Sequence, residues 1–204
     1  MKVKKLLKKG AESEIYLIDW YGHDAVSKIR LSKKYRHHYI DLVLRKQRTL
    51  HEANIISYAK MIGVETPFIY FLNSNNFEII MEYIHGNILK DSFSPDHCVE
   101  LGKIVGKLHF YNIIHGDITT SNFILVPKNR LVVIDFGLSF FSERLEDKAA
   151  DIRLFKEILN SIHVEHFETS FENFLLGYAE VYGKRSLKIF NTVNEIEQRG
   201  RYSR

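Results

Sequence analysis

HGDITTSN, residues 115–122, places one histidine, one aspartate and one asparagine within eight positions. A second acidic position follows in VVIDFGLS, where an apolar run ends at Asp135, eighteen residues after Asp117. Between them, Phe123–Val126 and Leu131–Ile134 have the apolar pattern of two short strands joined by a turn. We expect this hairpin to bring the two aspartates to one place.

These polar side chains have the chemistry that phosphoryl transfer requires. Mg²⁺ needs hard oxygen ligands, the attacking oxygen needs a group that orients it, and the nucleotide phosphates need a cation. Asn122 and Asp135 can supply metal ligands, and Asp117 can orient the attacking oxygen. Each motif alone has an ordinary structural explanation, so the prediction depends on their order along the chain.

The periodicity of apolar residues changes near the middle of the chain. Strands are predicted before that point, around one long helix, and the remainder is mostly helical apart from the hairpin. We therefore predict the α+β class, with a sheet-rich lobe at residues 1–84 and a helical lobe at 85–204. The predicted strands are Val3–Leu7, Ile15–Trp20, Asp24–Arg30, Phe68–Leu72 and Phe77–Met81, and the predicted helices are Tyr39–Ile62, Pro95–Tyr111 and the chain from Asp147 onward.

The composition is that of a globular protein, with 45% hydrophobic residues in 204. No stretch reaches the ~20 apolar residues of a membrane helix, and the basic start lacks the apolar core of a signal peptide, so a cytoplasmic location is predicted. The only cysteine, Cys98, excludes a disulfide within the chain and argues against a structural zinc site. We expect it to be a small core residue.

Three motifs together resemble those of protein kinases. HGDITTSN resembles the catalytic loop HRDxxxxN, IDFG resembles the metal-binding DFG, and AVSKIR resembles the third strand with its lysine. The resemblance implies a bilobal protein-kinase-like fold that binds ATP and Mg²⁺. It also implies that Asp117 is catalytic and that Asn122 and Asp135 hold the metal.

The same resemblance implies the residues of the nucleotide site. Lys28 would contact the phosphates and pair with Glu52 on the long helix. Met81 would precede a hinge at Glu82–Ile84, whose backbone would bind adenine, with Glu82 and Ile84 as the contacting positions. KKGAESE stands where GxGxxG is expected, so the chain would cover the phosphates with Gly10, Ala11, Glu12 and Ser13.

Two departures from ordinary protein kinases bear on regulation. Gly116 replaces the arginine that anchors a phosphorylated activation loop, which argues against activation by loop phosphorylation. Only thirteen residues separate Gly137 from Asp151, and they contain no APE-like motif, so a peptide substrate has no platform. Asp151 resembles the helix acid that supports the catalytic loop of kinases, but an ordinary acid at a helix start is an equal alternative.

Nearly the whole chain resembles one particular family. GAESEIY, KIR followed by LSKKYRHHYID, RTLHEA, HGDITTSN, DFGLS and EDKAADI, in this order, resemble the small atypical kinase/ATPase of the KEOPS (EKC) complex, called PRPK in some organisms. The resemblance implies serine/threonine kinase or ATPase activity that supports threonylcarbamoyladenosine modification of tRNA. It implies a tRNA threonylcarbamoyl transferase subunit and other KEOPS subunits as partners. The family's basic tail is only partly matched, by RGRYSR with Arg199, Arg201 and Arg204.

Other interpretations remain open at this point. A small-molecule or lipopolysaccharide-sugar kinase, or a RIO-like kinase, would also use an HGD-type loop, and a non-catalytic scaffold could retain the fold. His163 and His166 are interpreted as surface histidines. A basic stretch could contact tRNA directly or form a solvated helix face; it comprises Lys33, Lys34, Arg36, His37, His38, Arg45, Lys46 and Arg48.

Overall fold

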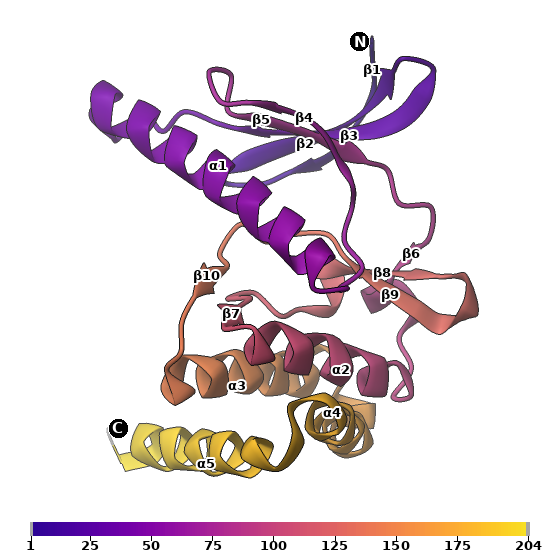
Figure 1. Cartoon of the computed structure of the whole chain (residues 1–204), viewed down its shortest axis with the longest axis vertical. Coiled ribbons are helices and arrows are strands. Elements are labelled where there is room, and N and C mark those ends of the chain that lie inside the picture. The colour runs from indigo at the N-terminus through magenta and orange to yellow at the C-terminus, as the bar shows by residue number, and fades with distance from the viewer. Residues whose placement is uncertain (1, 203–204) are drawn as a thin grey trace. The chain divides into compact units, whose positions relative to one another are not determined.

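The computed structural model describes residues 2–202, with side chains up to Arg199. The chain forms two compact units (Figure 1). The first unit contains the chain up to Lys60 and residues 66–85, and the second contains residues 61–65 and the chain from Gly86 onward. The sequence assigned residues 61–65 to the first lobe. They belong to the second unit because Glu65 O accepts from Val133 N, which ties this turn to a strand of that unit.

The first unit is an antiparallel five-stranded sheet with one long helix. The strand order is β1-β2-β3-β5-β4. Helix α1, His38–Met61, packs on one face through Ala53, which joins Ile79 and Met81 in a buried cluster (Figure 1). The strands are β1 Lys2–Lys9, β2 Ser13–Trp20, β3 His23–Arg30, β4 Ile69–Asn73 and β5 Glu78–Glu82.

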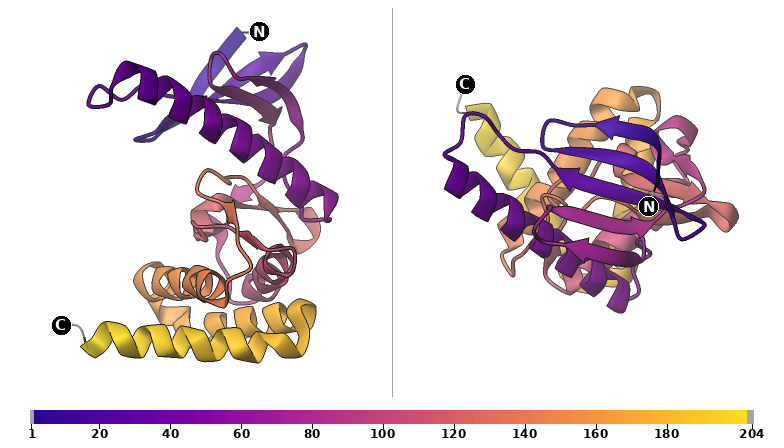
Figure 2. Two further views of the ribbon diagram at one scale, coloured as in Figure 1. Left: turned by 60° about the vertical axis from the view of Figure 1, so that its left-hand side comes forward. Right: turned by 90° about the horizontal axis from the view of Figure 1, so that it is seen from above.

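The second unit is mainly helical and carries two small sheets. One sheet has the order β6-β8-β9 and the other pairs β10 with β7. Figure 1 and the left view of Figure 2 place α4 and α5 on the side of α2 and α3 that faces away from these strands. The elements are β6 Asn87–Ile88, α2 His97–Phe110, β7 Ile113–Ile114, β8 Phe123–Val126, β9 Arg130–Val133, β10 Phe140–Phe141, α3 Leu145–Ile162, α4 Phe167–Tyr182 and α5 Ser186–Tyr202.

Glycines allow α2 and α4 to cross at close range. A Cβ on Gly177 of α4 would lie 1.9 Å from Val99 O, and a Cβ on Gly102 of α2 would lie 2.1 Å from Phe174 O. These distances are far inside van der Waals contact, so no side chain fits at either position. The crossing fixes α4 against α2, the helix that precedes the loop at residues 115–122.

The predicted α+β class and the two-lobed organisation agree with the structure. Most predicted boundaries differ by one or two residues. Phe77, predicted to open a strand, has φ of +57° and closes the β4–β5 turn instead. The two-residue strands β6, β7 and β10 were not predicted, because such short pairings leave no period to detect. None of the described helices combines the length and the apolar character needed to cross a membrane.

Candidate active site

The lysine and the helix glutamate predicted from the sequence form a buried ion pair in the first unit. Lys28 Nζ, on β3, donates to Glu52 Oε1 on α1 at 2.6 Å. Arg30 Nη2 donates to Glu52 Oε2 at 2.5 Å, so one carboxylate binds two cations. Arg30 lies two residues after Lys28 and projects from the same sheet face. Removing one partner of a buried pair leaves an uncompensated charge and costs about 3–5 kcal/mol.

The predicted nucleotide loop, residues 10–13, is a tight turn between β1 and β2. Gly10 N donates to Ser13 O at 2.9 Å, and Leu31 N donates to Glu12 O at 2.9 Å. Lys33 Nζ donates to Ala11 O. The backbone of this loop is therefore fixed by the two strands beside it and by the linker to α1.

The carboxylate of Glu12 is surrounded by arginines that the sequence did not reveal as its partners. Arg48 Nη1 donates to both oxygens, at 2.6 and 2.8 Å, and Arg30 and Arg36 approach to 3.9 Å. Partial burial would raise the pKa of Glu12, but Arg48 and the two other arginines hold that pKa below its ordinary value. Glu12 is thus an ionised anchor of the loop.

The predicted hinge begins where the ladder between β3 and β5 ends. Glu82 pairs with Ala25 as the last residue of the ladder. Phe68 receives a hydrogen bond on its carbonyl from Glu82 N at 2.8 Å and donates its own N–H to the Glu82 carboxylate at 3.0 Å. Ile84, half-buried, follows beyond these bonds. The adenine contacts of Glu82 and Ile84 stay a prediction.

The second unit brings together the aspartate and the asparagine of HGDITTSN. Asn122 Nδ2 donates to Asp117 O at 2.9 Å and to Asp117 Oδ2 at 2.8 Å. Ile134 N donates to Asn122 O at 3.0 Å, which attaches the loop to the strand leading to Asp135. Gly137 N donates to Asp135 Oδ1 at 2.9 Å and orients that carboxylate.

This donor set fits a magnesium ion that is bound together with a nucleotide. Both Nδ2 contacts of Asn122 are made to Asp117, so the amide oxygen Oδ1 is the atom that Asn122 can offer to a cation. Asp135 adds a carboxylate. Within residues 2–199, no cluster of three or more histidine, cysteine or acidic side chains forms a complete metal site. Mg²⁺ characteristically takes one or two carboxylates and completes its shell with phosphates and water.

Asp151, on α3, supports the loop at residues 115–122 by hydrogen bonds to its backbone. Its carboxylate accepts from His115 N at 2.7 Å and Gly116 N at 2.8 Å, and it lies 3.1 Å from His109 Nε2. Burial alone would raise the pKa of Asp151, but the hydrogen bond and charge of His109, with His115, hold it below its ordinary value. Of the two interpretations of Asp151, the structure agrees with the one in which this acid supports the loop through its backbone. Tyr178 extends the network, with its hydroxyl 2.9 Å from His109 Nδ1.

The glycine that replaces the kinase arginine is required by the local backbone. Gly116 has φ of +77°, and a Cβ there would lie 2.5 Å from Leu138 O. The segment after Asp135 therefore runs too close to the loop for any side chain at position 116. Ser139 Oγ fixes that segment by donating to His115 O at 2.8 Å.

His163, interpreted as a surface histidine, is half-buried and makes contacts that the sequence did not reveal. Its ring stacks on Phe93 with 3.7 Å between ring centroids, and its Nε2 lies 3.0 Å from Thr120 Oγ1 in the catalytic loop. Burial, with the nearby His166 and Lys90, lowers its pKa. Its helical spacing from His166 could not reveal a contact made across more than forty positions of sequence. His166 itself is exposed, as expected.

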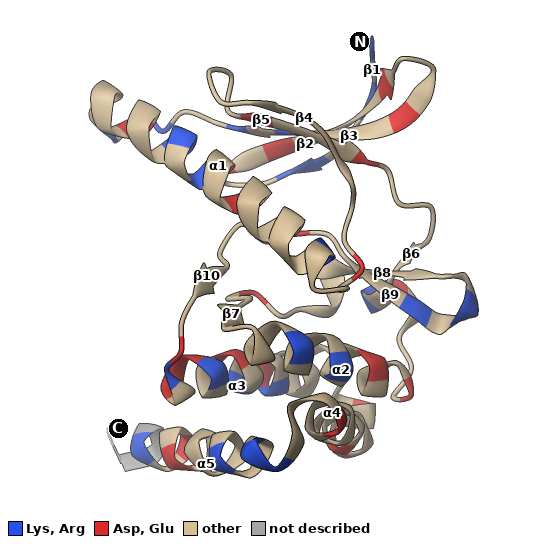
Figure 3. Cartoon of the chain, viewed as in Figure 1, with Lys and Arg blue, Asp and Glu red and all other residues tan. Residues whose placement is uncertain are grey.

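Several residues of the predicted basic stretch form ion pairs within the protein. Figure 3 shows where lysines and arginines lie along α1. Arg45 Nε donates to the buried Asp41 at 2.7 Å, and Arg36 lies 3.9 Å from the same carboxylate. Lys34 and Lys46 are exposed. The stretch is therefore neither a uniform phosphate-binding surface nor a simple solvated face. In the basic tail, Arg201 and Arg204 lie outside the described side chains.

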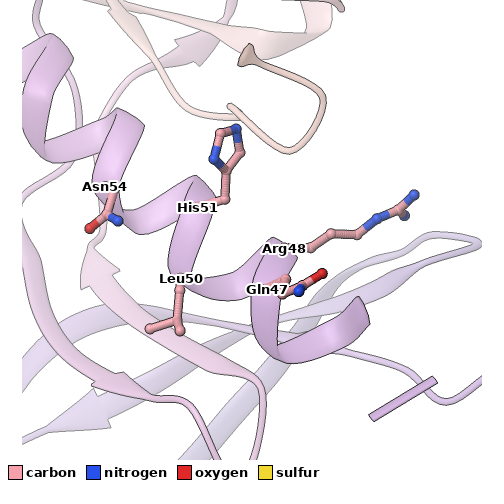
Figure 4. Close-up of a pocket in the computed structure, with 5 residues that line it drawn as sticks. All are labelled: Gln47, Arg48, Leu50, His51 and Asn54. Carbon is pink, nitrogen blue, oxygen red and sulfur yellow. The ribbon is translucent and has the colours of Figure 1, made fainter. Parts of the chain in front are cut away.

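An open pocket of about 430 Å³ lies against α1 (Figure 4). It contains Arg48, which also binds Glu12, but none of the residues predicted to hold nucleotide or metal. Its polar groups come from one helix and do not converge on a ligand atom, so we assign it no function. The lining residues are Gln47, Arg48, Leu50, His51 and Asn54.

No protein-family model matches the chain, but curated relatives do. The KEOPS complex subunit Bud32 of Pyrococcus abyssi is 41% identical, and the match covers 97% of this chain and 96% of that protein. A probable bifunctional tRNA threonylcarbamoyladenosine biosynthesis protein of Methanobrevibacter smithii is 44% identical over 97% of this chain. The match covers only 37% of that longer protein.

Solved structures establish the fold. The Rio2 kinase–ADP/Mg²⁺–phosphoaspartate complex from Chaetomium thermophilum superposes with a TM-score of 0.67 at 15% identity, covering 100% of this chain and 72% of that one. The fold is therefore protein-kinase-like, as the three motifs predicted.

Proposed function

Because the chain belongs to the family of the KEOPS complex subunit Bud32, we propose that it is an ATP-dependent kinase or ATPase that supports threonylcarbamoyladenosine modification of tRNA. The observation that carries the proposal is the double hydrogen bond from Asn122 to Asp117, on a loop that Asp151 holds by its backbone. A scaffold without activity has no need for this arrangement. The transferase subunit and other KEOPS subunits are the proposed partners, and the cytoplasm is the proposed location.

The residues have distinct proposed tasks. Lys28, positioned by its ion pair with Glu52, contacts the nucleotide phosphates. Asn122 Oδ1 and Asp135 hold Mg²⁺, which when bound supplies positive charge against the phosphate oxygens. Asp117 keeps one carboxylate oxygen on Asn122 and uses the other to accept the proton of the attacking hydroxyl or water. The positive charge near the phosphates and the base at the attacking oxygen are the two requirements of the reaction.

Mg-ATP turnover, measured with and without the transferase subunit and tRNA, tests the proposal. Wild-type protein should hydrolyse ATP, and Asp135→Ala should abolish turnover because no neighbouring side chain replaces the lost metal ligand. Glu157→Ala, which removes an exposed acid of α3, is the matched control. Retained turnover in Asp135→Ala, or none in any combination with wild-type protein, would overturn the proposed activity.

A RIO-like kinase is the second candidate, because the Rio2 kinase shares the fold. The two candidates differ in the partner that they require. Stimulation of ATP turnover by the transferase subunit supports the KEOPS function, whereas turnover that is indifferent to this subunit favours the alternative.

Direct contact with tRNA is a further part of the proposal. Lys34 and Lys46 are the exposed cations of the basic stretch, so Lys34→Glu and Lys46→Glu should weaken tRNA binding. Each lost phosphate contact should flatten the salt dependence by about one unit of slope. Lys128→Glu makes the same charge change at the β8–β9 turn and should leave the slope unaltered. Equal slopes in all variants would mean that the stretch is only a solvated surface.

A further inference from the structure

A continuous row of alternating charges runs through the first unit, from the lysine of β3 to the nucleotide loop. Glu52 binds both Lys28, at 2.6 Å, and Arg30, at 2.5 Å. Arg30 Nη1 lies 3.9 Å from Glu12, and Arg48 Nη1 closes on Glu12 at 2.6 Å. The order of charges along this row is plus, minus, plus, minus, plus.

Two members of the row, Glu52 and Arg48, lie on α1. Arg48 and Glu52 are four residues apart, which places them one helical turn apart on the same side. One turn of α1 therefore holds both the phosphate-binding lysine, through Glu52, and the loop, through Glu12. Figure 4 shows the Arg48 side chain extending away from the helix.

The loop combines a backbone of restricted freedom with a side-chain anchor. Gly10 is its only glycine, so the backbone lacks the freedom with which a glycine-rich loop adjusts to phosphates. Besides the backbone bonds at Gly10 and Leu31 and the Lys33 contact with Ala11 O, the Glu12 carboxylate holds the loop. An acid in a loop that is expected to contact anionic phosphates would repel them. Three arginines compensate the charge of Glu12.

We propose that Glu12 is a positioning residue, and that its ion pair with Arg48 controls how readily the loop at residues 10–13 opens and releases nucleotide. The inference rests on the proposed binding of ATP at this loop and adds its regulation. While Glu12 stays on Arg48, the loop stays with α1. When the pair breaks, the loop keeps its backbone bonds, the Lys33 contact with Ala11 O and the longer contacts of Glu12 with Arg30 and Arg36.

The expected effect is moderate and depends on salt. The side chains of Glu12 and Arg48 are 41% and 40% exposed, and exposed ion pairs are weak and screened. Loss of the pair should raise the loop-opening constant by roughly threefold to fivefold at low ionic strength. The difference should shrink at high ionic strength.

Hydrogen exchange in the nucleotide-free full chain measures the opening directly. Glu12→Gln and Arg48→Gln should each speed amide exchange at Gly10 and Leu31 by the factor given above, with an unchanged global unfolding midpoint. The double variant should be no faster than Glu12→Gln alone, because that substitution already removes the ion pair with Arg48. Glu14→Gln is the control, since Glu14 binds Tyr16 and Lys9 on the neighbouring strands and not the arginines.

Release of a fluorescent ADP analogue provides the second measurement. Glu12→Gln and Arg48→Gln should release it faster, again by a few-fold and only at low salt. If the wild-type chain binds no nucleotide, the proposed function fails, and loop exchange alone decides the role of Glu12. If the wild type binds nucleotide but the variants match it in exchange or in release, or if the two substitutions are additive, the role assigned to Glu12 is wrong.

Discussion

Asp117 is held at its side chain and at its backbone. Asn122 Nδ2 donates to its carboxylate, and its own N–H donates to His115 Nδ1 at 3.2 Å. His115 packs between Phe123 and Phe136, with ring centroids 6.2 and 5.2 Å away. The proposed proton acceptor therefore has little freedom to leave its position.

Asp117→Asn should lower ATP turnover by roughly 10²-fold or more while sparing nucleotide affinity, because the amide keeps the shape but cannot accept the proton. Turnover and nucleotide dissociation constants should be measured on the same preparation. A matching loss of affinity would instead assign Asp117 to binding.

His115 makes the loop sensitive to acid. Because Nδ1 accepts from Asp117 N, the ring is neutral in the folded state. Burial lowers its pKa, against the attraction of Asp151, Asp135 and Asp117. A folded-state pKa below the unfolded value of about 6.5 gives stability that is present above that value and is lost as the pH falls.

The free energy of unfolding should therefore decrease from about pH 7 toward pH 5. His115→Asn, whose side-chain oxygen can accept from Asp117 N, should reduce this pH dependence even if it lowers stability overall. His166→Asn, at an exposed histidine, should leave the dependence as in wild type. Denaturant titrations at several pH values measure all three, and an unaltered slope in His115→Asn would exclude His115 as the titrating group.

Helices α2 and α4 approach so closely that only glycine fits at their crossing. Gly177→Ala would place a methyl group 1.9 Å from Val99 O. Alanine normally favours a helix over glycine by about 1 kcal/mol, but here the helices must separate, at a cost of about 1–3 kcal/mol or more. Thermal unfolding should show a lower midpoint, whereas Leu176→Ala, next to it and exposed, should change it little. An increased midpoint in Gly177→Ala would contradict the close crossing.

The elements differ in how well the sequence predicts them. The strands and α1 follow from apolar periods that are local in the chain, and the hairpin between Asp117 and Asp135 follows from the short spacing of two motifs. The α2–α4 crossing could not be predicted, because a glycine in a helix has several explanations until its partner is known. The arginine partners of Glu12 and the contact of His163 with Thr120 were missed for the same reason: they join residues that are far apart in the sequence.

At the scale of the whole molecule, the segment between Gly137 and Asp151 stabilises the second unit through backbone pairing. Phe140 and Phe141 pair with Ile114 and Ile113, and Ser142 N donates to Asn112 O at 2.8 Å. One edge of this backbone is therefore taken up by β7, and the segment serves the packing of the second unit. We therefore expect substrate selection and activation to come from contacts with other molecules.

The isolated chain should therefore phosphorylate generic serine or threonine peptides only at background level, and the transferase subunit should stimulate its ATP turnover. Radiolabel transfer to a mixed peptide set and a phosphate-release assay measure the two parts. Asp135→Ala with the same partner controls for contaminating ATPases. Efficient peptide phosphorylation without any response to the subunit would mean that the protein acts as an ordinary protein kinase.

The crowding of Gly116 by Leu138 O restricts how this protein can evolve. A glycine codon becomes an arginine codon by one nucleotide change, so the genetic code leaves the ordinary kinase residue within easy reach. The positive φ and the neighbouring carbonyl make that change structurally unacceptable unless the chain after Asp135 is rerouted first. Control by a phosphate on its own loop would thus need several coordinated changes, whereas control by a bound partner can be altered one surface residue at a time.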